Sequence, residues 1–112
     1  MKMIIQSEKD LKFLQGKFVI EINDETPDKN LMEIPWPFAK EKRLKIVSEF
    51  GFVDLFGCRT NYKDFESFKR VFNDYLFNHM IEKGEKSGGR FHRLLTQDEL
   101  QYLFEKIKSE NY

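Results

Sequence analysis

The chain has 112 residues, with 19 Lys and Arg against 19 Asp and Glu, so its formal net charge is zero. Globular domains cluster near ~100–150 residues, which predicts one domain over residues 1–112. The balanced charge excludes a uniformly basic coat for nucleic acid and argues against nucleic acid as the main partner. A hydrophobic fraction of 40%, with 15% aromatic residues, excludes a wholly disordered chain.

The compartment follows from what the chain lacks. Charged residues appear after only a few apolar positions at the N-terminus, so we expect no signal peptide. No apolar run approaches the ~20 residues of a membrane span. The single cysteine, Cys58, has no internal partner for a disulfide. These features predict a cytoplasmic protein without a membrane partner.

The pattern of residues in the first third of the chain predicts a short helix followed by a strand. Ser7 is a candidate N-cap, and Gly16 is a candidate C-terminal stop for that helix. Alternating apolar positions predict a strand over 17–22. Three prolines lie in the irregular connection 23–42, and they predict an extended or turned path over residues 34–38. A connection of this length is uncommon in a small domain and is often functional.

Strand character returns in 43–50 and again in 52–57. Gly51, between them, indicates either a bulge or a tight turn. Segment 90–95 is open to two interpretations, a final strand or an extended lead-in to a helix. Strands that follow one another without strict helix alternation favour an antiparallel sheet.

Two helices are predicted in the second half. Apolar side chains recur at spacings of three and four from about 62 to 83, which is typical of a long amphipathic helix. Thr96 and Glu99 have the spacing of a capping box before a helix near 97–109. We therefore predict an α+β domain in which one long helix and a C-terminal helix pack on a small, mainly antiparallel sheet. The expected sheet segments are 2–6, 17–22, 43–50 and 52–57.

No motif predicts catalysis, a cofactor or a metal. Cys58 lies beside Arg59, whose charge would favour a thiolate, but a cysteine nucleophile also needs a histidine base. His79 falls on the apolar face of the long helix, which suggests a core residue. The cysteine and two histidines lack zinc-binding spacing. We predict a protein that is not an enzyme, with no catalytic residue, no cofactor and no metal.

Acidic residues gather between Glu21 and Glu33, where five carboxylates stand against Lys29. Two aromatic residues framed by prolines follow directly. An acidic rim beside aromatic anchors suits recognition of a basic protein. The other interpretation, given equal weight, places the aromatics in the core and the acids on a solvated edge. The candidate protein-binding residues are Asp24, Glu25, Asp28, Glu33, Trp36 and Phe38.

The segment from Lys83 to Arg93 is locally basic, with four cations and one acid. Its glycines and donor side chains make Arg90, His92 and Arg93 candidate anion-binding residues. If this segment is a strand, Arg90 and His92 share one face and Arg93 lies on the other. An ordinary polar hairpin or loop before the capped helix is the favoured interpretation.

The leading hypothesis is a small protein-binding module. Its most concrete form is an inhibitor of the immunity or antitoxin type that masks a basic partner such as a nuclease toxin, by analogy of size and chemistry. The alternative is a nucleotide- or nucleic-acid-binding protein, with a nuclease included, that uses the Arg90/His92/Arg93 tract. A third hypothesis is a homodimer joined through Phe77 and Ile81, which lie off the main apolar stripe of the long helix.

Overall fold

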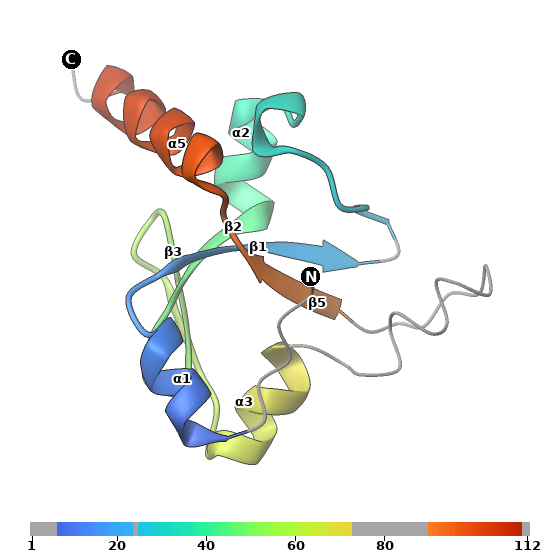
Figure 1. Cartoon of the computed structure of the whole chain (residues 1–112), viewed down its shortest axis with the longest axis vertical. Coiled ribbons are helices and arrows are strands. Elements are labelled where there is room, and N and C mark those ends of the chain that lie inside the picture. The colour runs from blue at the N-terminus through green and yellow to red at the C-terminus, as the bar shows by residue number, and fades with distance from the viewer. Residues whose placement is uncertain (1–6, 24, 73–89, 111–112) are drawn as a thin grey trace.

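The fold is built around a five-stranded antiparallel sheet with helices on both of its faces (Figure 1). A computed structural model describes residues 7–23, 25–72 and 90–110. Its helices and sheet confirm the predicted α+β class. The strand order is β4-β3-β2-β1-β5, with these bounds: β1 Phe18–Asn23, β2 Leu44–Val47, β3 Gly51–Asp54, β4 Arg59–Asn61 and β5 Arg90–Leu94.

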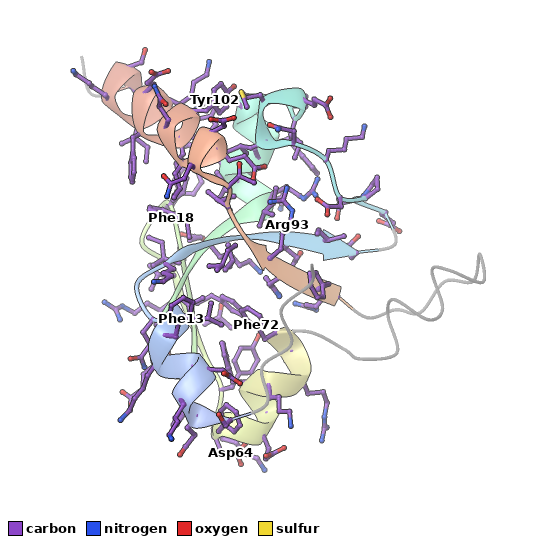
Figure 2. All side chains as sticks on the ribbon, in the orientation of Figure 1. Phe13, Phe18, Asp64, Phe72, Arg93 and Tyr102 are labelled. Carbon is purple, nitrogen blue, oxygen red and sulfur yellow. The ribbon has the colours of Figure 1, made fainter. Side chains whose placement is uncertain are left out.

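The pairing of β1 with β5 decides which side chains share a face of the sheet. Glu21 lies opposite His92, and Ile20 lies opposite Arg93. Because side chains alternate along a strand, Glu21 and His92 face one helical layer, and Ile20 and Arg93 face the other. Figure 2 shows Phe72, from the first layer, and Arg93 on opposite sides of the sheet.

The first helical layer consists of α1 (Glu8–Leu14) and α3 (Phe65–Phe72). The predicted ends of α1 are confirmed: Ser7 is the N-cap, and Gly16 follows the helix with a φ of 80°. Both helices cover one hydrophobic cluster on the sheet. Its buried members are Leu11, Leu14, Val19, Val47, Phe52, Phe68 and Phe72.

The predicted long helix is described only over its first part. The helix α3 begins at Phe65 because the Asp64 side chain accepts a hydrogen bond from the Ser67 amide, 2.8 Å away, as an N-cap does. Residues 73–83 of the predicted helix lie outside the described residues. So does the segment 2–6 that was expected to form a strand.

The second layer contains α5 (Gln97–Glu110) and the connection that precedes β2. The predicted capping box is confirmed: the Glu99 amide donates to Thr96 Oγ1 at 3.2 Å, and the Thr96 amide donates to Glu99 Oε1 at 2.9 Å. The cluster beneath this layer buries Ile20, Leu31, Ile34, Ala39, Leu44, Leu95 and Leu103.

No helix in the described ranges is long and apolar enough to cross a membrane.

The connection is helical where the sequence predicts an extended or turned path. A short 3-10 turn, Leu31–Glu33, precedes α2 (Trp36–Phe38), which continues into a π-helical turn, Ala39–Arg43. Pro35 is the N-cap of α2, and Pro37 lies within its first turn. Neither position requires an amide for an intrahelical hydrogen bond, so these prolines are compatible with a helix start.

The strand predictions for 43–50 and 52–57 extend too far. β2 ends at Val47, and the chain turns back before β3 begins at Gly51, so the glycine follows a tight turn. After β3 the Asp54 carboxylate accepts from the amides of Phe56 at 2.8 Å and Cys58 at 2.9 Å. This side-chain turn ends the strand at Asp54. The all-polar β4 that follows was not predicted.

Candidate functional site

The irregular connection between β1 and α2 is held in place by hydrogen bonds at both of its ends. Near β1, the Asn23 side chain accepts from the amides of Glu25 at 2.9 Å and Thr26 at 3.0 Å. Arg43 is only 3% exposed and donates to the carbonyl oxygens of Glu21 at 2.7 Å and Pro27 at 3.0 Å. The buried Arg43 side chain thus joins β1 to the loop that follows it.

The far end of the same loop is anchored by Leu31. Its side chain is fully buried, and its amide donates to the Glu99 carboxylate at 2.8 Å. Asn30 caps the 3-10 turn by accepting from the Met32 amide at 3.0 Å. Ile34 is buried as well, whereas Met32 and Glu33 are exposed. The loop is therefore anchored by two buried side chains, Leu31 and Ile34, and exposes the residues between them.

The two aromatic residues of this region have different environments. Trp36 is half-buried, packs edge-on against Tyr102 of α5 at a centroid distance of 6.3 Å, and donates from its indole nitrogen to Glu110. Figure 2 shows Tyr102 reaching from α5 toward α2. Phe38, in contrast, is 42% exposed. Of the two, Phe38 is the residue with a large aromatic surface available to a partner.

The structure brings Glu25, Glu33 and Phe38 to one cavity of about 180 Å³. We call this the acidic-aromatic cavity. Lys29 and Arg43 also line it, but the Arg43 guanidinium is bonded to backbone carbonyl oxygens and buried. Glu25, Glu33 and Lys29 are exposed, so carboxylates outnumber cations at the accessible rim.

The remaining members of the predicted acidic set are placed differently. Asp28 forms an ion pair with Arg93 at 2.8 Å, although about half of its side chain stays exposed. Its carboxylate is therefore engaged within the chain. Asp24 lies outside the described residues. The predicted protein-binding set thus contributes three of its members to the acidic-aromatic cavity.

The candidate anion-binding residues do not share a surface. His92 has no exposed area, and Arg90 lies on the same face of β5 with its guanidinium 3.6 Å from Glu21. Arg93 lies on the other face and is paired with Asp28 and Glu99. The expectation that Arg90 and His92 share one face of a strand, opposite Arg93, agrees with the described geometry.

Arg93 and Glu99 form a partly buried ion pair. The sequence indicated a capping role for Glu99 and an anion-binding role for Arg93, but not their pairing. Burial alone would raise the pKa of Glu99, but hydrogen bonds from Arg93 and from the Thr96 and Leu31 amides hold the pKa at about 2. The same carboxylate raises the pKa of Arg93. Glu99 is therefore an ionised, buried carboxylate that supports the loop behind the cavity.

In the described part of the chain, no group of three or more His, Cys, Asp or Glu side chains is arranged to hold a metal ion. Cys58 is an exposed free thiol in the turn after β3. His79, Phe77 and Ile81 lie outside the described residues, so the homodimer hypothesis is not addressed by the described contacts.

Comparisons with protein family models, with curated proteins and with solved structures find no match for this chain.

Proposed function

We propose that this protein is a small protein-binding module that binds a basic partner through the acidic-aromatic cavity. The observation that carries the proposal is the convergence of the exposed carboxylates of Glu25 and Glu33 with the exposed ring of Phe38 around one concavity. Exposed charges steer the encounter with an oppositely charged protein, and a large aromatic side chain supplies affinity once it is covered.

The exposed apolar side chains of the loop also favour a protein partner. Met32, in the loop before α2, is 47% exposed, as Phe38 of α2 is 42% exposed. Exposed large apolar residues beside charged ones are a common feature of protein interaction sites. A partner that covers the loop would remove this apolar surface from water.

The support beneath the loop makes it suited to binding. Arg43 and the Leu31 amide tie its two ends to buried groups, and the Asn23 and Asn30 side chains fix its turns. A surface already held in one conformation loses less entropy when it binds. This pre-organisation supports the loop as a recognition element.

The most concrete form of the proposal is an inhibitor of the immunity or antitoxin type that masks a nuclease toxin. A nuclease presents cationic groups to phosphates, so an acidic surface with an aromatic anchor is complementary to it. The alternative of a nucleic-acid-binding protein has less support, because Arg93 is paired with two carboxylates and His92 is fully buried.

The proposal is tested by affinity purification of the tagged protein from the cells that naturally produce it. We expect a basic protein to be recovered in stoichiometric amount with the wild type and to be lost with Glu25→Lys/Glu33→Lys. The matched control is Glu49→Lys/Glu105→Lys, which reverses the same charge at two exposed sites outside the cavity lining. Equal recovery with both double variants, or no stoichiometric partner with the wild type, would overturn the proposal.

A further inference from the structure

His92 of β5 lies in the core against two aromatic rings that also stack on each other. Its side chain has no exposed area, and its ring stacks on Phe52 of β3 and Phe72 of α3, at centroid distances of 4.6 and 5.3 Å. Its interplanar angles with them are 23° and 29°. A titratable ring therefore occupies the contact between the sheet and the first helical layer.

One nitrogen of this ring links the sheet to α3. His92 Nδ1 lies 2.5 Å from the backbone carbonyl oxygen of Phe72. A carbonyl oxygen only accepts hydrogen bonds, so Nδ1 must carry a hydrogen and donate. In the neutral ring the other nitrogen, Nε2, is then unprotonated.

The second nitrogen, Nε2, carries no proton in the neutral ring but lies near a carboxylate. Nε2 lies 3.5 Å from Glu21 Oε1 and has no hydrogen-bond partner among the described groups. In the neutral ring its lone pair faces an anionic oxygen, which is unfavourable. Protonation at Nε2 would replace this repulsion with an N–H directed at a carboxylate.

Two other cations already interact with that carboxylate oxygen. Lys45 Nζ of β2 lies 2.9 Å from Glu21 Oε1, and Arg90 of β5 lies 3.6 Å from it. Burial alone would raise the pKa of Glu21, but the neighbouring His92 and Lys45 hold the pKa at about 2, so the carboxylate is ionised in mild acid. A charged His92 would be the third cation around one carboxylate.

These opposing influences keep the ring neutral at pH 7. Burial lowers the pKa of His92 below its ordinary value, Glu21 and the Phe72 carbonyl act in the opposite direction, and Lys45 reinforces the lowering. The described charged groups that face the ring are Glu21, Lys45 and Arg90; α3 presents the Phe72 carbonyl to it.

We propose that protonation of His92 weakens the contact between α3 and the sheet. In mild acid Nε2 takes up a proton, and the imidazolium that forms has no exposed surface and shares its nearest carboxylate with two other cations. Separation of α3 from β5 hydrates this buried charge, so acidification weakens the α3 contact.

The direction of the pH dependence follows from linkage. The ordinary pKa of histidine is near ~6.5, and a value lowered in the folded protein means that the open form binds the proton more readily. The contribution of neutral His92 to the α3 contact is therefore complete above about pH 6.5. It is lost progressively as the pH falls toward the lower pKa of the folded state.

Amide hydrogen exchange directly tests whether acid weakens the α3 contact. We expect protection of the α3 amides, corrected for intrinsic exchange rates, to fall more steeply between pH 7 and pH 5 than protection of the β1 and β2 amides. In His92→Gln, which keeps an amide donor but does not titrate, this difference should disappear. Parallel loss of protection in α3 and in β1 of the wild type would overturn the proposal.

A second measurement stays informative if the His92→Gln protein does not fold. Histidine titration by NMR should show His92 with a pKa below ~6.5, raised in Lys45→Met and lowered further in Glu21→Gln. The control Lys12→Met removes an exposed lysine of α1 and should leave the titration unchanged. A wild-type value at or above ~6.5, or no response to Lys45→Met, would contradict the proposal.

Discussion

Arg93 and Glu99 are joined by two parallel hydrogen bonds, from Nη1 to Oε1 at 2.8 Å and from Nη2 to Oε2 at 3.0 Å. The same carboxylate accepts from the Leu31 amide and caps α5 through Thr96. One buried side chain thus connects β5, the start of α5 and the loop behind the acidic-aromatic cavity.

Substitution of Glu99 by Gln should destabilise the protein strongly. The Arg93 guanidinium would keep Asp28 but lose its buried charged acceptor, and the loss of hydrogen bonds to a charged group costs about 1.5–3 kcal/mol. Urea unfolding at pH 7 measures the change in the free energy of unfolding. The control Glu105→Gln, on the exposed face of the same helix, should change it by less than about 0.5 kcal/mol. Equal effects of the two variants would contradict the central role of Glu99.

The free energy of unfolding should fall in acid over a defined range. Glu21 and Glu99 both have a pKa of about 2 in the folded protein, below the ordinary value near 4.5. A lowered carboxyl pKa contributes stability that is present above the unfolded value and is lost as the pH falls through the folded value. Urea unfolding between pH 6 and pH 2 should show this loss mainly below about pH 4.5. Glu99→Gln should reduce the slope there; an unchanged slope would contradict the assignment.

Gly51 should be intolerant of any side chain. A Cβ atom at this position would lie 1.9 Å from the Thr60 carbonyl oxygen of β4, so Gly51→Ala should separate β3 from β4 and cost about 3 kcal/mol, the upper end of overpacking. Gly57→Ala is the matched control, because its Cβ would meet no atom within 4 Å and only the positive φ of 85° is strained. That strain costs about 1–2 kcal/mol. Thermal unfolding should rank Gly51→Ala as the more damaging change.

Substitution of Trp36 should lower the stability of the fold, whereas substitution of Phe38 should leave it nearly unchanged. Trp36→Ala removes the contact with Tyr102 and the hydrogen bond to Glu110, and should cost about 2 kcal/mol, less than the ~3–5 kcal/mol of a fully buried tryptophan. Phe38→Ala should change the free energy of unfolding by less than about 0.5 kcal/mol, because its ring is exposed. A larger loss of stability for Phe38→Ala than for Trp36→Ala would place Phe38 in the core.

Local signals in the sequence predicted local structure well. The N-cap at Ser7, the stop at Gly16 and the Thr96/Glu99 capping box each depend on residues within a few positions of one another. The spacing of apolar residues likewise predicted the α+β class. In contrast, β4 contains only exposed polar residues and is a strand because it pairs with β3. No local pattern in the sequence predicts this pairing.

Long-range contacts account for most of what the sequence did not predict at the candidate site. The Leu31 amide meets the Glu99 carboxylate across 68 positions, and Trp36 packs on Tyr102. These contacts decide that Trp36 is partly covered while Phe38 is exposed. Likewise, the strand pattern placed His92 on one face of the sheet, but only α3 shows that this face is buried at that point.

In the proposed function, Phe38 anchors a basic partner at the acidic-aromatic cavity. Its most direct test is titration calorimetry of the partner recovered by affinity purification, with Phe38→Ser compared with Phe13→Ser. Both phenylalanines are exposed, at 42% and 56%, but only Phe38 lines the cavity. We expect Phe38→Ser to weaken binding by about tenfold or more, as at a binding hot spot, and Phe13→Ser to leave the affinity unchanged. Unaltered affinity in Phe38→Ser, or an equal loss in Phe13→Ser, would contradict the account.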